Sequence, residues 1–232
     1  MLQGLPSSLD TLMNWTWDDI APFQQALLDR PLDAANVVEW LDDRAALGAR
    51  IGEVYSRLYV ALTVNTADAD AKARFETYIE NVLPEARMAD QKLKEKLLAS
   101  GLKPEGYDIA LRNMVSEADL FREANVPLFT VEDKLRTEYD DIAGGQTVQW
   151  NGEERTVAQM KPLQFDPDRS TRERAWRLVA ERQLADREAF NALWQRFLPL
   201  GGEIAANAGK ADYRNYQWQE KQRFDNSIGD AH

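Results

Sequence analysis

Residues Val131–Val157 read VEDKLRTEYDDIAGGQTVQWNGEERTV, and the spacing of apolar residues changes within this stretch. The first part has helical spacing, which predicts a helix that begins at Thr130 as a cap residue and ends near Ile142, before Gly144-Gly145. After the glycines the apolar residues alternate, as they do in a strand. The stretch therefore predicts a helix followed directly by β-structure.

The β-structure is predicted to be a hairpin near residues 146–158. Asn151-Gly152 supplies the positive φ angles that both central positions of a type I′ turn require. A two-residue turn pairs Trp150 with Glu153 and Val148 with Arg155, so the stem of Arg155 could lie along Trp150. One hairpin is marginally stable alone, so we expect it to pack on helices.

The first half of the chain predicts a long antiparallel helical hairpin. The first helix is expected to open at Pro31-Leu32-Asp33, with Asp33 as its cap, and to run to about Val64. The second helix follows the turn 65–68, ends at Ser100-Gly101, and should kink at Pro84.

The residues after the hairpin predict another long helix. Asp166-Pro167 has the form of a cap followed by proline at the first helical position, and Ser170 with Glu173 is a competing capping box one turn later. Pro199 and Gly201-Gly202 should bend or break this helix. The final aromatic group is expected in a last helix or loop and comprises Tyr213, Tyr216, Trp218 and Phe224. The fold class expected is mainly α, with long antiparallel helical hairpins and one small β-hairpin.

Composition narrows the class of protein. The 232 residues are 44% hydrophobic and 29% charged, as in globular proteins, and 39 acidic against 28 basic residues give a formal charge of -11. This balance argues against nucleic-acid partners and anionic membranes. There is no cysteine, no apolar run long enough to span a bilayer and no recognisable signal peptide, so a cytoplasmic location is the expectation.

The residues suggest no complete catalytic site. The only histidine is His232, so neither a protein-made zinc site nor a serine–histidine arrangement can be assembled. Neighbouring acidic residues such as Asp140-Asp141 point in different directions on a helix and are interpreted as solvated surface. We therefore assign no catalytic, metal-binding or cofactor-binding residue.

Several segments resemble the oligoendopeptidase F branch of the thimet-oligopeptidase-like zinc metallopeptidases. The matching strings are NVPLFTVEDKL, TEYDDIAGGQTVQWNGEERTVAQMKPL, DRSTRERAWR and EIAANAGKADYRNYQW, the last followed by RFD. The resemblance implies an almost entirely helical protein with a deep channel for short peptides. It also implies zinc held by an HExxH helix and by a further glutamate downstream of that helix, and no HExxH motif occurs in this sequence.

The chain is accordingly expected to be the N-terminal part of such an enzyme, inactive and without zinc when alone. It is expected to divide into an N-terminal helical region, 1–125, and a region of helix, hairpin and long helix, 126–232. Self-association is expected through apolar surface around Trp194, Phe197, Tyr216 and Trp218. The alternatives are a helical interaction or peptide-binding module without catalysis, and an unrelated helical scaffold. Peptide specificity, oligomeric state and pathway do not follow from the sequence.

Overall fold

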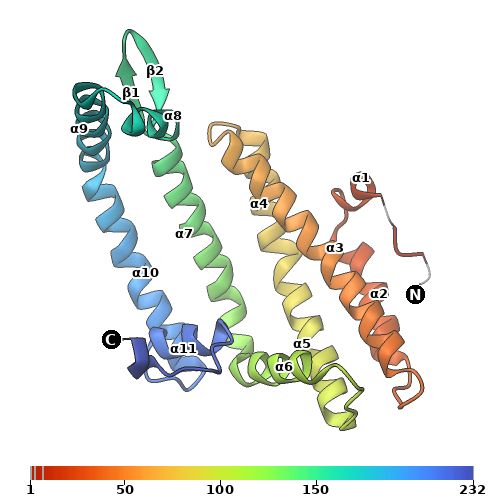
Figure 1. Cartoon of the computed structure of the whole chain (residues 1–232). Coiled ribbons are helices and arrows are strands. Elements are labelled where there is room, and N and C mark those ends of the chain that lie inside the picture. The colour runs from red at the N-terminus through yellow and green to blue at the C-terminus, as the bar shows by residue number, and fades with distance from the viewer. Residues whose placement is uncertain (1, 3, 7, 232) are drawn as a thin grey trace.

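The computed structural model describes residues 2, 4–6 and 8–231 and is mainly α, with a two-stranded antiparallel sheet. Figure 1 shows two groups of helices, which we call the N-terminal arm (α1–α5) and the C-terminal arm (α7–α11). Helix α6, Asp108–Leu120, runs along one end of the molecule and joins the arms. The predicted fold class is confirmed.

The N-terminal arm contains α1 (Leu9–Leu12), α2 (Trp17–Asp29), α3 (Val37–Val64), α4 (Ala69–Asn81) and α5 (Leu83–Ser100). Its core is built from residues that repeat at helical spacing, including Trp40, Leu47, Leu62, Phe75, Ile79, Leu93 and Leu97. The indole of Trp40 is fully buried and donates to the Leu27 carbonyl at 2.9 Å, which ties α3 to α2. The predicted helical hairpin is therefore present.

Two details of this arm differ from the prediction or refine it. Asp33 does not cap α3: its Oδ1 accepts from the backbone of Ala35 and Asn36, closing a turn, and α3 begins four residues later. The second long helix is divided into α4 and α5 at Val82. Pro84 lies in the first turn of α5, where a backbone N–H would have no acceptor within the helix, so the proline removes no helical hydrogen bond.

Helix α7, Val126–Gly144, begins directly after the 3₁₀ turn η1, Glu123–Asn125. The prediction of a start at Thr130 was wrong, because Pro127 occupies the first turn of the helix and Thr130 lies inside it, donating to the Ile79 carbonyl. Asn125 is fully buried and donates from Nδ2 to the Ile204 carbonyl at 3.0 Å. The division of the chain at residue 125 stays a prediction.

The hairpin is formed by β1 (Thr147–Trp150) and β2 (Glu153–Thr156), with the predicted register. Asn151 and Gly152 have φ values of 53° and 85°, as the type I′ turn requires. The ring of Trp150 is covered by Arg174 of α9, 4.2 Å from its centroid, whereas Arg155 pairs with Glu153. The hairpin packs with α8 (Val157–Met160) and α9 through Val148, Met160, Ala175 and Val179.

The C-terminal arm is completed by η2 (Lys161–Phe165), α9 (Arg169–Ala185), α10 (Arg187–Asn207), α11 (Tyr213–Glu220) and η3 (Ile228–Ala231). Asp166 does not cap α9; Asp168 does, accepting from the backbone of Ser170 and Thr171. Of the bend or break predicted at Pro199 and Gly201-Gly202, the break does not occur. A proline inside a helix costs about 3 kcal/mol, but burial of Leu200 and Ile204 contributes about 1.5–3 kcal/mol each, so α10 continues through it.

The arms have separate apolar cores and are joined across α7 mainly by polar contacts, which we call the inter-arm seam. The seam consists of Tyr59–Asp140, Lys72–Asp141, Glu80–Lys134 and Arg87–Asp133. In each pair the first residue belongs to α3, α4 or α5 and the second to α7.

Candidate functional site

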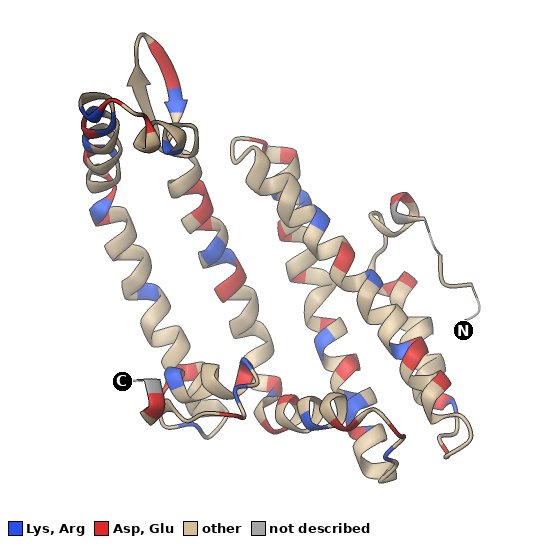
Figure 2. Ribbon diagram, viewed as in Figure 1, with Lys and Arg blue, Asp and Glu red and all other residues tan. Residues whose placement is uncertain are grey.

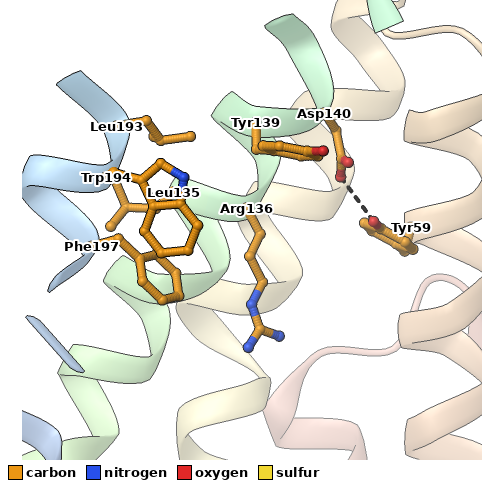
Figure 3. A pocket seen from close by; sticks show the side chains of 8 residues that line it. All are labelled: Tyr59, Leu135, Arg136, Tyr139, Asp140, Leu193, Trp194 and Phe197. Atoms are coloured by element: carbon orange, nitrogen blue, oxygen red, sulfur yellow. Dashed lines mark hydrogen bonds between the residues drawn. The ribbon is translucent and has the colours of Figure 1, made fainter. Parts of the chain in front are cut away.

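A cleft of about 320 Å³ lies where α3, α7 and α10 come together, and we call it the α7–α10 cleft. Its lining residues are Tyr59, Leu135, Arg136, Tyr139, Asp140, Leu193, Trp194 and Phe197. Figure 3 shows Leu193, Trp194 and Phe197 on one side, Tyr59 on the other, and the α7 side chains between them. This combination of an apolar wall and a few polar groups is typical of small-molecule and peptide sites.

The apolar wall of the cleft comes from α10. Beyond its first turn this helix carries only Arg196 and Glu203 as charged residues, and its ribbon is correspondingly mostly tan in Figure 2. Trp194 packs edge-on against Phe197 at 5.6 Å yet remains 55% exposed, and Tyr139 remains 50% exposed. Aromatic rings left open in this way are suited to stacking on a ligand.

The predicted apolar surface is therefore only partly where we expected it. Trp194 is exposed, but Tyr216 is 5% exposed because it stacks on Tyr213 beneath α10. Phe197 is half-buried in the wall of the cleft. Trp218 is half-buried too, and its indole donates to the Asn226 carbonyl.

The charged residues of the α7–α10 cleft are Arg136 and Asp140, one turn apart on α7. Arg136 donates from Nη2 to Glu132 at 2.8 Å. Partial desolvation lowers the pKa of Arg136, but the charge and hydrogen bond of Glu132 together with the charge of Asp133 outweigh it, so the pKa is raised. Asp140 accepts the Tyr59 hydroxyl at 2.8 Å, and burial together with this hydrogen bond raises the pKa of Tyr59 to about 12. Tyr59 is thus a donor at neutral pH.

A second hollow, of about 250 Å³, lies between α5, α7 and α11 and also contacts Arg136. Its charged residues are largely paired with each other, as in Arg87–Asp133 and Lys94–Asp90. Glu220 lines it, and burial with the nearby Glu132 charge raises the pKa of Glu220. Because most charged residues of this hollow pair with each other, we do not interpret it as a ligand site.

The side chains of the described residues do not fit a zinc ion. Within residues 2, 4–6 and 8–231 no group of three or more histidine, cysteine, aspartate or glutamate residues is placed to hold a metal. Cysteine is absent from the sequence, and its one histidine, His232, lies outside the described residues. In the described part of the chain no helix has both the length and the apolar character needed to cross a membrane.

The fold can be compared with solved structures. A structure of a protein assigned as oligoendopeptidase F matches 92% of this chain with a TM-score of 0.82 at 20% sequence identity. Oligoendopeptidase F of Bacillus anthracis strain Ames, also an assigned function, matches 91% with a TM-score of 0.78 at 17% identity. PZ peptidase A, solved with inhibitor 2, matches 99% with a TM-score of 0.80 at 20% identity. The chain has an oligoendopeptidase F-like fold.

This result confirms the resemblance predicted from the sequence at the level of the fold. The chain spans only 39–41% of the length of these structures, so it corresponds to a part of the oligoendopeptidase F-like architecture. No family model matches the sequence, and no curated protein matches it either.

Sequence reasoning assigned no site residue, and it did not find the α7–α10 cleft. Asp140 was interpreted as solvated surface, yet it lines the cleft. The available signal was the stretch of α10 with few charged residues, which contains Leu193, Trp194 and Phe197. A helix face with few charged residues is also typical of an ordinary buried core, so only the packing of the helices reveals the cleft.

Proposed function

We propose that this chain forms the helical portion of an oligoendopeptidase F-like zinc metalloendopeptidase that hydrolyses short peptides. The observation that carries the proposal is the fold match over 91–99% of the chain at TM-scores of 0.78–0.82. The α7–α10 cleft supports it, since its open aromatic wall can contact a peptide. The zinc ligands must come from sequence other than the described residues, and no catalytic step is assigned to this chain.

A second candidate is a helical peptide-binding or interaction module without catalysis. It is favoured by the combination of an open cleft with a donor set that does not suit zinc. A cytoplasmic location and self-association through the exposed surface around Trp194 remain proposals for either candidate.

The two candidates are separated by a peptidase assay with a quenched fluorescent peptide, run beside metal analysis. We expect the 232-residue chain to bind no stoichiometric zinc and to leave the peptide intact. A longer protein that includes any HExxH helix encoded after residue 232 should bind zinc, cleave the peptide and lose activity with a chelator. Chelator-sensitive cleavage by the short chain, after removal of contaminating protease, would overturn the proposal. A following reading frame without HExxH would favour the module.

A further inference from the structure

The acidic side chains in the central part of α7 have cationic partners with one exception. The paired ones are Glu132 with Arg136, Asp133 with Arg87, Glu138 with Arg196, and Asp141 with Lys72. Asp140 forms no ion pair with any residue that the structure describes; its Oδ2 accepts only the Tyr59 hydroxyl. Because this half-buried carboxylate faces a cleft, it can accept a cation from a ligand without first breaking an ion pair.

The guanidinium of Arg136 also retains binding capacity. A guanidinium has five N–H donors, and Arg136 directs Nη2 to Glu132, whereas Nη1 and Nε find no acceptor in the described part of the chain. In Figure 3 this group extends into the space between the helices, away from Asp140. Arginine is well suited to a carboxylate, which it can bind through two parallel hydrogen bonds.

The two groups are spaced for a short molecule that carries both charges. Residues one turn apart on a helix have Cβ atoms about 5–6 Å apart, and the side chains of Arg136 and Asp140 diverge from there. Two or three extended residues span roughly 7–11 Å. The cleft, at about 320 Å³, lies at the small end of the range for ligand sites.

We propose that the α7–α10 cleft binds short peptides, of two or three residues, as zwitterions with both termini free. The terminal ammonium pairs with Asp140, the terminal carboxylate pairs with Arg136, and an apolar or aromatic side chain contacts Trp194. The lining carries one positive and one negative charge, which matches a ligand of zero net charge. This inference deepens the proposed peptide-handling role and rests on it.

The experiment measures binding by calorimetry, with phenylalanyl-leucine as the probe and three blocked forms: N-acetylated, C-amidated and doubly blocked. Charge-assisted hydrogen bonds typically contribute enough to change affinity about tenfold or more. We expect each single block to weaken binding to the unmodified chain by about tenfold. Asp140→Asn should abolish the effect of N-acetylation alone, and Arg136→Gln should abolish the effect of C-amidation alone.

Matched controls exist elsewhere in the chain. Arg177 is 63% exposed and pairs with Glu173 one turn earlier, as Arg136, 56% exposed, pairs with Glu132. Among the described residues, Asp42 accepts only a tyrosine hydroxyl, that of Tyr107, as Asp140 accepts that of Tyr59. Arg177→Gln and Asp42→Asn should leave the affinity and the effect of both blocks unchanged. Circular dichroism of every variant verifies folding.

The proposal is overturned if the free and doubly blocked peptides bind the unmodified chain equally, or if none binds at millimolar concentration. It is also overturned if the cleft and control variants behave alike. Because binding and not hydrolysis is measured, absence of peptidase activity leaves this test intact. Conversely, blocking either terminus of the peptide could leave its affinity unchanged while a longer protein cleaves peptides. That result would overturn the zwitterion site and would still support the proposed function.

Discussion

Replacing Gly201 by alanine tests the packing of α11 against α10. Gly201 is buried inside α10, and a Cβ built there would lie 2.9 Å from two ring carbons of Tyr213. Carbon atoms normally approach to about 3.5–4.0 Å. The Tyr213 ring cannot easily withdraw, because its hydroxyl donates to Glu132 at 2.9 Å and accepts from Gln217.

Two effects of opposite sign act on this variant. Alanine is favoured over glycine inside a helix by about 0.5–1 kcal/mol. Overpacking a closed site costs about 1–3 kcal/mol, so the net result should be a loss of up to about 2 kcal/mol in the free energy of unfolding. Gly202 is the matched control, because it lies in the same helix and nothing is within 4 Å of a Cβ there.

The assay is urea unfolding followed by circular dichroism at 222 nm. Gly202→Ala should raise the free energy of unfolding by the helix preference alone, while Gly201→Ala should lower it. The difference between the variants, about 1–3 kcal/mol, isolates the contact with the Tyr213 ring. Equal stabilisation by both substitutions would refute the reasoning and place the ring elsewhere.

Three further predictions concern the hairpin, a buried amide and a seam ion pair. Gly152→Val should lower the melting temperature, because valine resists the φ of 85° in the turn, and an unchanged value would count against the type I′ geometry. Asn125→Ala should cost about 1–3 kcal/mol in urea unfolding, because it removes two side-chain hydrogen bonds, one to the Ile204 carbonyl, which also accepts from Ala208, and one from the Asn207 amide; a loss under 0.5 kcal/mol would contradict this. The hydrogen bond to Asp141 raises the pKa of Lys72 above 10.5. The pair therefore stabilises the fold at neutral pH and this contribution declines as the pH rises past that value. Unfolding midpoints of the unmodified chain and Lys72→Met should differ at pH 8 and converge as the pH rises above 10.5, whereas a constant difference would disprove the linkage.

Local signals predicted the hairpin and the helix periodicity well, because Asn151-Gly152 and the spacing of apolar residues act over a few positions. Helix starts were less predictable. Asp166 and Asp168 have the same capping chemistry; Asp168 caps α9, while Arg172 donates to the carbonyls of Asp166 and Pro167. A capping pattern in the sequence cannot contain that contact.

The candidate site was beyond sequence reasoning for a different reason. Tyr59 and Asp140 meet although 81 positions separate them. Helical periodicity says which face of each helix is apolar, but not which faces meet or how far apart the helices stand. The continuation of α10 through Pro199 was missed for the same reason, since burial under Tyr213 and around Ile204 is set by the tertiary fold.

The inter-arm seam has a mechanical consequence. Apolar cores hold each arm together, whereas the seam includes ion pairs such as Lys72–Asp141 and Arg87–Asp133. Dissolved salt weakens such partly exposed contact pairs, although less than it weakens charges separated by more than the Debye length of about 8 Å. Contacts between the arms are therefore expected to be more sensitive to ionic strength than the apolar interior of each arm. Since the α7–α10 cleft contains Tyr59 from one arm and Trp194 from the other, we expect its width to respond to salt more than the packing within either arm.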